Sequence, residues 1–305
     1  MSLRDRLMLL DTPSLYFRAF HGVPTTVTAP DGSPVNAVRG LLDFVARLVR
    51  THHPDRLVAC FDADWRPAFR VAALPSYKAH RVAPDGGETV PDELSPQVPV
   101  IEAVLDAVGI ARIGVAGYEA DDVIGTLAVA AAGPVDIVTG DRDLFQLVRD
   151  DQPVRVVYTA ARGVGHAEIV NEAAVASRYG IPGRAYADFA MLRGDPSDGL
   201  PGVAGIGAKT AASLVTRFGS VPAMLAAVDA EETAGFPAGA RARLSAARDY
   251  LAAAGPVVRV AIDVPLPVYD DTQPRSPRDP ERLVELADRW ALDSALNRLL
   301  AALAG

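Results

Sequence analysis

Three short apolar runs in the first half of the chain each end in an aspartate, and segments with helical spacing separate them. The runs are RLMLLD (6–11), RLVACFD (56–62) and VDIVTGD (135–141). Apolar residues recur at the spacing of an amphipathic helix in residues 36–50, 98–109 and 119–132. This alternation predicts an α/β fold with a mostly parallel, twisted sheet flanked by helices. Ligands of such sheets bind at the carboxyl ends of the strands, so we expect Asp11, Asp62 and Asp141 to lie along one edge.

The second half has a different pattern. From about Glu168 onward the chain is predicted to be almost entirely helical, and its last helical segments are expected to pack back on the sheet. We therefore divide the chain into an α/β core (1–167) and a helical region (168–305). Residues 82–97 contain three prolines and two glycines, which cannot continue a helix. They predict a mobile loop or lid between a helix carrying Lys78 and the helix that begins near Val98.

Composition limits the class of protein. No apolar run reaches membrane-spanning length, and the charged start is a poor secretory signal, so we expect no membrane partner. The single cysteine, Cys60, lies in an apolar run, which favours a reduced compartment and a cytoplasmic protein, by default a monomer. The net charge of −8 argues against a simple basic nucleic-acid binder. That argument weakens if the carboxylates hold metal ions.

Acidic residues gather where the predicted elements end. Nine of them fall in five short segments: Asp11, Asp62, Glu119, Asp121, Asp122, Asp141, Asp143, Asp195 and Asp198. Carboxylates without cysteine or histidine partners suit hard ions such as Mg²⁺ or Mn²⁺, and two ions about 4 Å apart can cut a phosphodiester. Separately, EADD (119–122) is equally explained as charge at a helix N-terminus, and GDPSDG (194–199) as a capped turn. The combination on one sheet favours metal binding.

Lysine is nearly absent from the chain. There are 28 arginines and two lysines, Lys78 and Lys209. Their positions are either chance or a requirement for a compact ammonium group.

A glycine-rich stretch, residues 199–215, surrounds the second lysine. Gly202, Gly205 and Gly207 form a predicted tight turn that opens into a helix, with Lys209 and Thr210 in its first turn. Backbone N–H groups at such a turn can contact a phosphate, as in a helix–hairpin–helix motif that grips the DNA backbone. An ordinary helix–helix connection is the alternative. A nucleotide-binding loop is disfavoured, because no strand precedes the glycines and the Walker pattern is absent.

Taken in order, these motifs resemble the 5′-nuclease family, which includes the 5′→3′ exonuclease domain of bacterial DNA polymerase I and the flap endonucleases. The motifs are LLDTPSLYFRAFHG, FDA, YKAHR, GYEADD, VTGDRDLFQLV and GDPSDGLPGVAGIGAKTA. The resemblance runs from Leu9 to at least Val215, and the chain looks like a stand-alone form without a polymerase domain. It implies a PIN-like core and a helix-three-turn-helix C-terminal region.

The resemblance also implies roles for individual residues. Asp11, Asp62 and Asp121 would surround one ion, and Asp141, Asp143 and Asp195 another, while Glu119, Asp122 and Asp198 would bind directly or through water. Lys78 and Arg81 would act in catalysis from one face of a helix near the scissile phosphate. Arg18 and Arg70 would bind phosphates of the 5′ strand, and Tyr77 would stack on a terminal base. The alternatives are a solvated arginine for Arg18 and a half-buried helix tyrosine for Tyr77. Backbone carbonyls near Val203 and Ile206 would hold K⁺.

The leading hypothesis is a structure-specific 5′→3′ exonuclease or flap endonuclease that uses two or more Mg²⁺ or Mn²⁺ ions. Its partners would be DNA with a 5′ flap, nick, gap or free 5′ end. The arch segment that the resemblance implies, near residues 70–97, is short and broken. How a 5′ strand is admitted is therefore open, and so is the balance between exonuclease and flap-endonuclease activity. One alternative is another metal-dependent phosphohydrolase or ribonuclease on a PIN-like fold. The other is a DNA-binding scaffold without catalysis.

Overall fold

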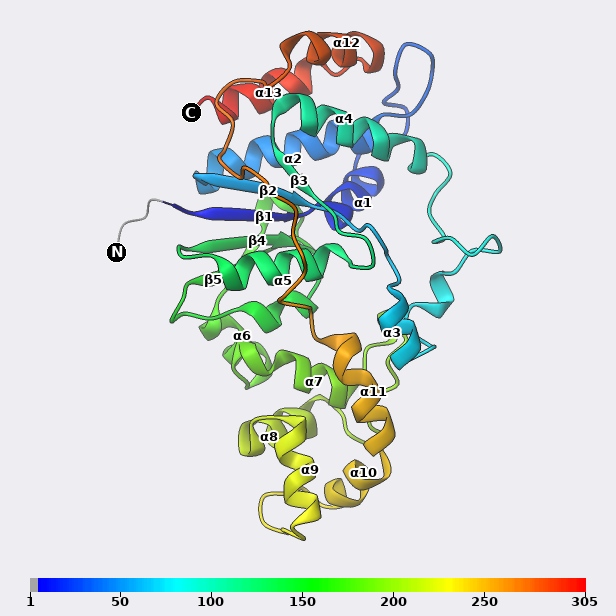
Figure 1. The fold of residues 1–305 in the computed structure, drawn as a ribbon, viewed down its shortest axis with the longest axis vertical. Coiled ribbons are helices and arrows are strands. Elements are labelled where there is room, and N and C mark those ends of the chain that lie inside the picture. The colour runs from blue at the N-terminus through cyan, green and yellow to red at the C-terminus, as the bar shows by residue number, and fades with distance from the viewer. Residues whose placement is uncertain (1–4) are drawn as a thin grey trace.

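A six-stranded sheet forms the centre of the computed structural model, which describes residues 5–305 (Figure 1). The strands are β1 (Leu7–Asp11), β2 (Arg56–Cys60), β3 (Ala111–Ile113), β4 (Val135–Thr139), β5 (Val154–Tyr158) and β6 (Glu168–Val170). Their order is β3-β2-β1-β4-β5-β6, and all neighbours are parallel except β5 and β6. The predicted α/β class is confirmed, and β3, β5 and β6 add to the three strands that were expected.

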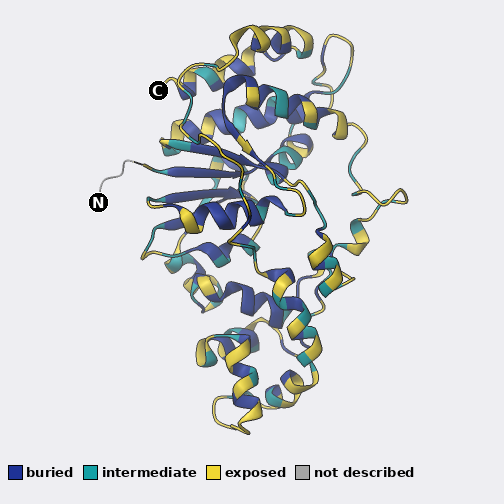
Figure 2. Ribbon diagram, viewed as in Figure 1, coloured by how far each residue is buried: buried dark blue, intermediate teal, exposed yellow. Residues whose placement is uncertain are grey.

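The apolar runs form strands because both faces of the sheet are covered. Successive residues of β1 enter opposite clusters, with Leu7 and Leu9 in one and Met8 and Leu10 in the other. Helices α1 (Thr12–Gly22), α2 (Asn36–His52) and α4 (Val98–Val108) lie on the second side, and α5 (Ala120–Ala130) lies on the first. Figure 2 shows the strands almost wholly buried between these helices.

The helical region follows the sheet and contains helices α6 (Glu172–Tyr179), α7 (Tyr186–Arg193), α8 (Ala208–Phe218), α9 (Val221–Asp229), α10 (Ala240–Ala246) and α11 (Arg248–Val258). Figure 1 shows them below the sheet. Because β6 pairs with β5, the sheet extends to Val170, three residues past the predicted boundary at 167. Residues 1–4 of the predicted first domain lie outside the described part of the chain.

An extended connector, residues 259–279, then returns the chain to the sheet. Helices α12 (Pro280–Trp290) and α13 (Asp293–Leu303) follow and pack beside α4 and α2 (Figure 1). The connector is held by hydrogen bonds along its length. Ala261 N–H donates to Asp122 at 2.7 Å, and Leu57 N–H donates to the Asp271 carbonyl at 2.8 Å. The end of α11 is thereby tied to the first turn of α5.

The segment between β2 and α4 contains little helix. Helix α3 (Ala68–Ala73) is followed by a one-turn 3₁₀ helix, Ala79–Arg81, and by a small hairpin in which Val82 pairs with Glu88. The predicted helix around Lys78 is wrong. Lys78 itself has a φ of 47° and lies in the left-handed region, which ends any helix there.

In residues 5–305 no single helix is long and apolar enough to cross a membrane. Helices α8 and α9 pass that test only as a pair, and they meet at an angle of 77°.

Candidate nuclease active site

The strand order reverses between β1 and β4, and the predicted aspartates lie at that point. From β1, successive strands are added outward to β3 on one side of the sheet, and from β4 they are added outward to β5 on the other side. Such a reversal opens a crevice at the carboxyl ends of the strands. A pocket of about 440 Å³ lies there, called the acidic pocket below. Five of the nine predicted carboxylates line it: Asp11, Asp62, Glu119, Asp121 and Asp141.

Asp11 and Asp141 are positioned by the chain next to them. Asp11 ends β1 and caps α1 by accepting a hydrogen bond from Ser14 N–H at 3.2 Å. The Thr139 hydroxyl at the end of β4 donates to Asp11 as well. Gly140 follows, and a Cβ at that position would lie 2.9 Å from Ser14 Oγ. Glycine therefore allows α1 to approach the end of β4, which brings the two carboxylates together.

Asp62 and Asp121 come from the other side of the crevice. Asp62 accepts a hydrogen bond from Ala120 N–H at 2.7 Å, which joins the end of β2 to the start of α5. Asp121 is in the first turn of α5, where the helix dipole favours a negative charge.

The acidic pocket raises the pKa of its carboxyl groups. Burial is the main cause for Asp11, whose pKa is raised to about 7, with Asp62 adding repulsion and Thr139 opposing the shift. Burial likewise raises the pKa of Asp62 to about 6. The pKa of Asp121 is well above its usual range, through burial and repulsion by Asp11 and Asp141. Among residues 5–305, none of these three carboxylates forms an ion pair, and Lys78 opposes the shifts of Asp62 and Asp121 only in part.

Three further carboxylates lie beside the pocket. Asp195 and Asp198 flank Ser197, which lines it, and Asp195 N–H and carbonyl both pair with Leu200 across a tight turn. Burial, then Asp141 and Asp198, raise the pKa of Asp143 well above its usual range. Burial also raises the pKa of Asp198 to about 6, against the opposing effect of Lys78.

The residues fit a site for hard divalent ions. The carboxylates offer oxygen ligands only, and an ion would offset the repulsion among Asp11, Asp121 and Asp141. Within residues 5–305, however, no three His, Cys, Asp or Glu side chains lie close enough together to hold an ion as they stand.

Lys78 and Arg81 both line the acidic pocket, although they do not share a helix face as predicted. Lys78 Nζ forms an ion pair with Glu119, and Arg81 Nη2 donates to the Ser197 carbonyl at 2.9 Å. Two cations therefore line the same pocket as the carboxylates.

Three predicted roles are wrong, because the side chains are buried in a network of their own. Arg70 is 2% exposed and forms an ion pair with Asp122, which is fully buried and outside the pocket lining. Tyr77 is 3% exposed and donates its hydroxyl hydrogen to Glu119. Arg70 is thus not free to bind a DNA phosphate, Tyr77 cannot stack on a base, and Asp122 does not face an ion.

Comparison with known proteins decides the family. A family model described as the N-terminal resolvase-like domain of 5′-3′ exonucleases matches residues 6–180, and one described as their C-terminal SAM fold matches residues 181–281. The chain belongs to the 5′-3′ exonuclease family. The predicted family and its hydrolytic nuclease activity are confirmed.

Relatives in this family match the chain over nearly its whole length. A 5′-3′ exonuclease from Streptomyces coelicolor is 62% identical over 97% of this chain and 99% of its own. One from Mycobacterium tuberculosis is 52% identical over 99% of this chain and 98% of its own. DNA polymerase I from Mycobacterium leprae is 38% identical over 99% of this chain but only 32% of its own.

Solved structures share the fold. A bacteriophage T5 flap endonuclease in complex with DNA and metal ions has a TM-score of 0.63, with 18% identity and coverage of 98% of this chain and 100% of that one. Human GEN1 bound to Holliday junction DNA has a TM-score of 0.61, with 16% identity over 98% of this chain and 71% of that one.

The glycine turn of this family member connects α7 to α8. Gly202 and Gly205 have φ values of 71° and 76°, which favour glycine, whereas Gly207 has an ordinary φ of −90°. Lys209 is exposed and Thr210 half-buried in the first turn of α8.

The side chains of Val203 and Ile206 are each 3% exposed and anchor the turn in the core. The Val203 carbonyl accepts from Ile206 N–H, and the Gly205 carbonyl accepts from Arg243 at 3.1 Å. The K⁺ site at this turn stays a prediction.

Arg18 lies next to the acidic pocket rather than in it. It lines a second pocket with Phe17 and His21, and Phe17 and Ser14 belong to both pockets. Among the described residues, Arg18 Nε is buried without a hydrogen-bond partner.

Several pocket residues were not predicted from the sequence: Phe17, Trp65, Glu88, Arg142 and Tyr158. Arg142 stands between two predicted ligands, and Glu88 is in the predicted lid, so their neighbours gave a signal. Phe17 directly precedes Arg18 in the motif LLDTPSLYFRAFHG and so had a signal too, whereas Trp65 and Tyr158 lie outside every motif quoted above.

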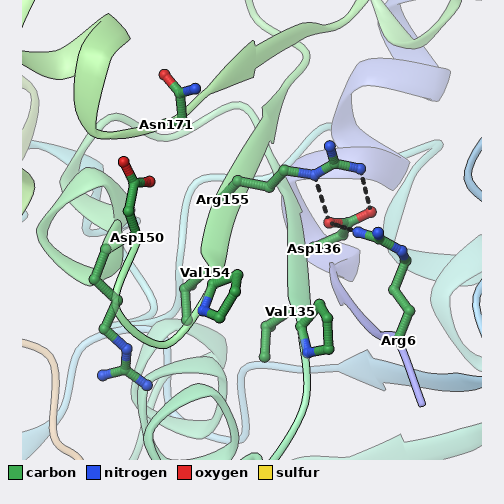
Figure 3. Close-up of a pocket in the computed structure, with 10 residues that line it drawn as sticks. Arg6, Val135, Asp136, Asp150, Val154, Arg155 and Asn171 are labelled. Carbon is green, nitrogen blue, oxygen red and sulfur yellow. Dashed lines mark hydrogen bonds and ion pairs between the residues drawn. The ribbon is translucent and has the colours of Figure 1, made fainter. Parts of the chain in front are cut away.

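A smaller pocket lies at the other ends of the strands, where β4 and β5 begin, and contains a carboxylate whose charge is compensated (Figure 3). Asp136 of β4 is fully buried there, but Arg6 and Arg155 donate to it at 2.9 and 2.7 Å. Because this buried carboxylate is already paired with two arginines, it is not available to bind a metal ion.

Proposed function

We propose that the chain hydrolyses DNA phosphodiesters near 5′ flaps, nicks, gaps and free 5′ ends, with two or more Mg²⁺ or Mn²⁺ ions held in the acidic pocket. We further propose that it acts as a monomer in the cytoplasm. The observation that carries the proposal is the acidic pocket itself. Carboxylates from separate chain segments line one pocket together with Lys78 and Arg81, where the strand order of a mostly parallel sheet reverses.

The carboxylates and the two cations of the acidic pocket have different proposed roles. Asp11, Asp62, Asp121 and Asp141 would hold the ions, with Asp143, Asp195 and Asp198 beside them. When bound, such ions make a water nucleophilic and neutralise charge on a phosphate. Lys78 and Arg81 bind the non-bridging oxygens of the scissile phosphate, which stabilises the charge that develops on them.

DNA binding would extend beyond the pocket on two sides. Lys209 and the N–H groups at the start of α8 contact phosphates of the duplex without reading bases. Arg18, which lines the neighbouring pocket with Phe17, would meet a strand that leaves the acidic pocket past Phe17.

The test is a comparison of wild type with Asp141→Asn on 5′-flap, nicked and blunt DNA duplexes and on a matched RNA, with Mg²⁺, with Mn²⁺ and with chelator. We expect wild type to cut the flap and nicked DNA only with a divalent ion. Asp141→Asn should lose cleavage by a factor of about 10³ or more, because a ligand of the ions is removed, with DNA affinity little changed. Full activity in the variant, or a preference for RNA, would contradict the proposal.

A further inference from the structure

We propose that Arg70 and Tyr77 are positioning residues that act through Glu119 to hold the Lys78 ammonium group at the wall of the acidic pocket. The inference rests on the proposed function, because it assigns Lys78 to the scissile phosphate. It replaces the direct DNA contacts that the sequence suggested for Arg70 and Tyr77.

Glu119 is the centre of the network. It is 4% exposed, and its two oxygens accept hydrogen bonds from three side chains. Tyr77 Oη donates to Oε2 at 2.7 Å, Arg70 Nη1 donates to Oε2 at 2.6 Å, and Lys78 Nζ donates to Oε1. Both oxygens are thus occupied, so Glu119 anchors a cation rather than offering a free ligand to an ion.

Arg70 is itself fixed on several sides. Its two terminal nitrogens each donate to Asp122 at 2.7 Å, and Nε donates to the Val257 carbonyl at 3.1 Å. A guanidinium group with this many partners in a buried site has no freedom to turn. Arg70 and Lys78 together balance the charges of Glu119 and Asp122, so the buried network is neutral.

The backbone of Lys78 is held as firmly as its side chain. Its N–H donates to the Asp198 carbonyl at 3.1 Å, and Arg66 Nε donates to the Tyr77 carbonyl at 2.6 Å. The φ of 47° is unusual for a residue with a side chain, and such a backbone persists only where its surroundings determine it. The residue is therefore fixed at both ends.

A lysine suits this position better than an arginine. An ammonium group has three donors, and here Glu119 takes one and the Trp65 carbonyl, at 3.5 Å, is near a second. The third remains for an oxygen of the substrate. The chain has 28 arginines and only two lysines. One of the two lysines thus occupies the position where a compact cation must bind Glu119 and a substrate oxygen at the same time.

The experiment uses the scarcity of lysine. In the metal-free protein, an amine-selective acylating reagent modifies Lys78 and Lys209, and mass spectrometry gives the ratio of their rates. Lys209 is exposed, whereas the Lys78 side chain is 15% exposed and paired, so we expect Lys78 to react at least tenfold more slowly. Tyr77→Phe and Arg70→Met should raise the Lys78 rate several-fold and leave the Lys209 rate unchanged. Arg70→Lys should restore part of the protection.

Single-turnover and steady-state cleavage of flap DNA provide the second measurement. Tyr77→Phe, which removes one hydroxyl and keeps the ring, should lower kcat about tenfold with KM within about twofold, as expected for a lost positioning contact. Tyr269→Phe, on the connector, is the matched control and should behave as wild type.

Two results would overturn the inference. One is an unchanged Lys78 to Lys209 ratio in both Tyr77→Phe and Arg70→Met. The other is a raised KM with unchanged kcat, which would mean that these side chains bind DNA directly. If wild type fails to cleave any DNA while the ratio responds as expected, the proposed function fails and the network stands.

Discussion

Two buried aspartates, Asp136 in β4 and Asp121 in the first turn of α5, have opposite electrostatic surroundings. Asp136 lies between two guanidinium groups, whereas burial and neighbouring carboxylates raise the pKa of Asp121. The same substitution should therefore change stability in opposite directions at the two sites.

Asp136→Asn should destabilise the protein by about 3 kcal/mol, because it leaves Arg6 and Arg155 without the charge that compensates them. Urea denaturation in the presence of chelator measures the change. Cleavage by the folded variant should match wild type, since Asp136 is at the edge of the sheet away from the acidic pocket.

Asp121→Asn should stabilise the metal-free protein by about 1 kcal/mol or more, because each pKa unit by which a site opposes ionisation corresponds to about 1.4 kcal/mol. It should also abolish cleavage, since a ligand of the ions is lost. Thermal denaturation at pH 8 with chelator tests the first statement. A lower midpoint than wild type would show that Asp121 is already compensated in the metal-free protein.

Residue roles divide into those that the sequence could reveal and those that it could not. Asp11, Asp62 and Asp141 follow recognisable buried runs, so their meeting at one edge follows from the rules of parallel sheets. Tyr77 and Asp122 lie in equally suggestive motifs and Arg70 lies in none, yet all three have partners from segments far apart in the chain, such as the Val257 carbonyl that accepts from Arg70. Burial by distant segments leaves no local pattern.

At the scale of elements, the glycine turn between α7 and α8 has one position that must be glycine and one that need not be. A Cβ on Gly202 would lie 2.6 Å from the backbone of Arg193, and its φ is 71°. Nothing lies within 4 Å of a Cβ on Gly207.

Gly202→Ala should therefore lower stability by about 2 kcal/mol or more through backbone strain and displacement of the turn. Gly207→Ala should keep wild-type stability and weaken DNA binding only, because its Cβ would point into open space where a phosphate is expected to approach. Denaturation and a DNA-binding titration on both variants check the pair. Equal loss of stability would contradict the expectation.

The elements that sequence reading missed are short or lack a distinctive pattern. Strand β3 has three residues with an arginine in the middle, and β6 pairs antiparallel at the sheet's edge. The predicted helix around Lys78 failed because a left-handed residue interrupts it, and contacts with distant residues such as Asp198 and Glu119 hold that conformation.

For the molecule as a whole, the acidic pocket makes stability depend on pH. Asp11, Asp62 and Asp198 have folded-state pKa values raised to about 7, 6 and 6. A raised carboxyl pKa contributes stability that is complete below the unfolded value, near 4, and is lost as pH rises through the folded value. The metal-free protein should therefore lose stability from about pH 5 to pH 8.

Divalent ions should reverse this trend, because they bind the ionised carboxylates and compete with protons. We expect the rise in melting temperature on adding Mn²⁺ to be small at pH 5 and to grow toward pH 8. Thermal denaturation across this range, with chelator or with excess Mn²⁺, measures both slopes. A metal-free stability that increases from pH 5 to pH 8 would contradict the raised pKa values.

The packing of α13 on α2 has a consequence for biosynthesis. Leu296, Leu299 and Leu303 cover apolar positions of α2, and Arg298 pairs with Asp43. On the ribosome, α2 emerges long before residues 293–303, so the part of its surface that α13 covers stays exposed until those residues follow. A nascent polypeptide of this kind presents a target for chaperones.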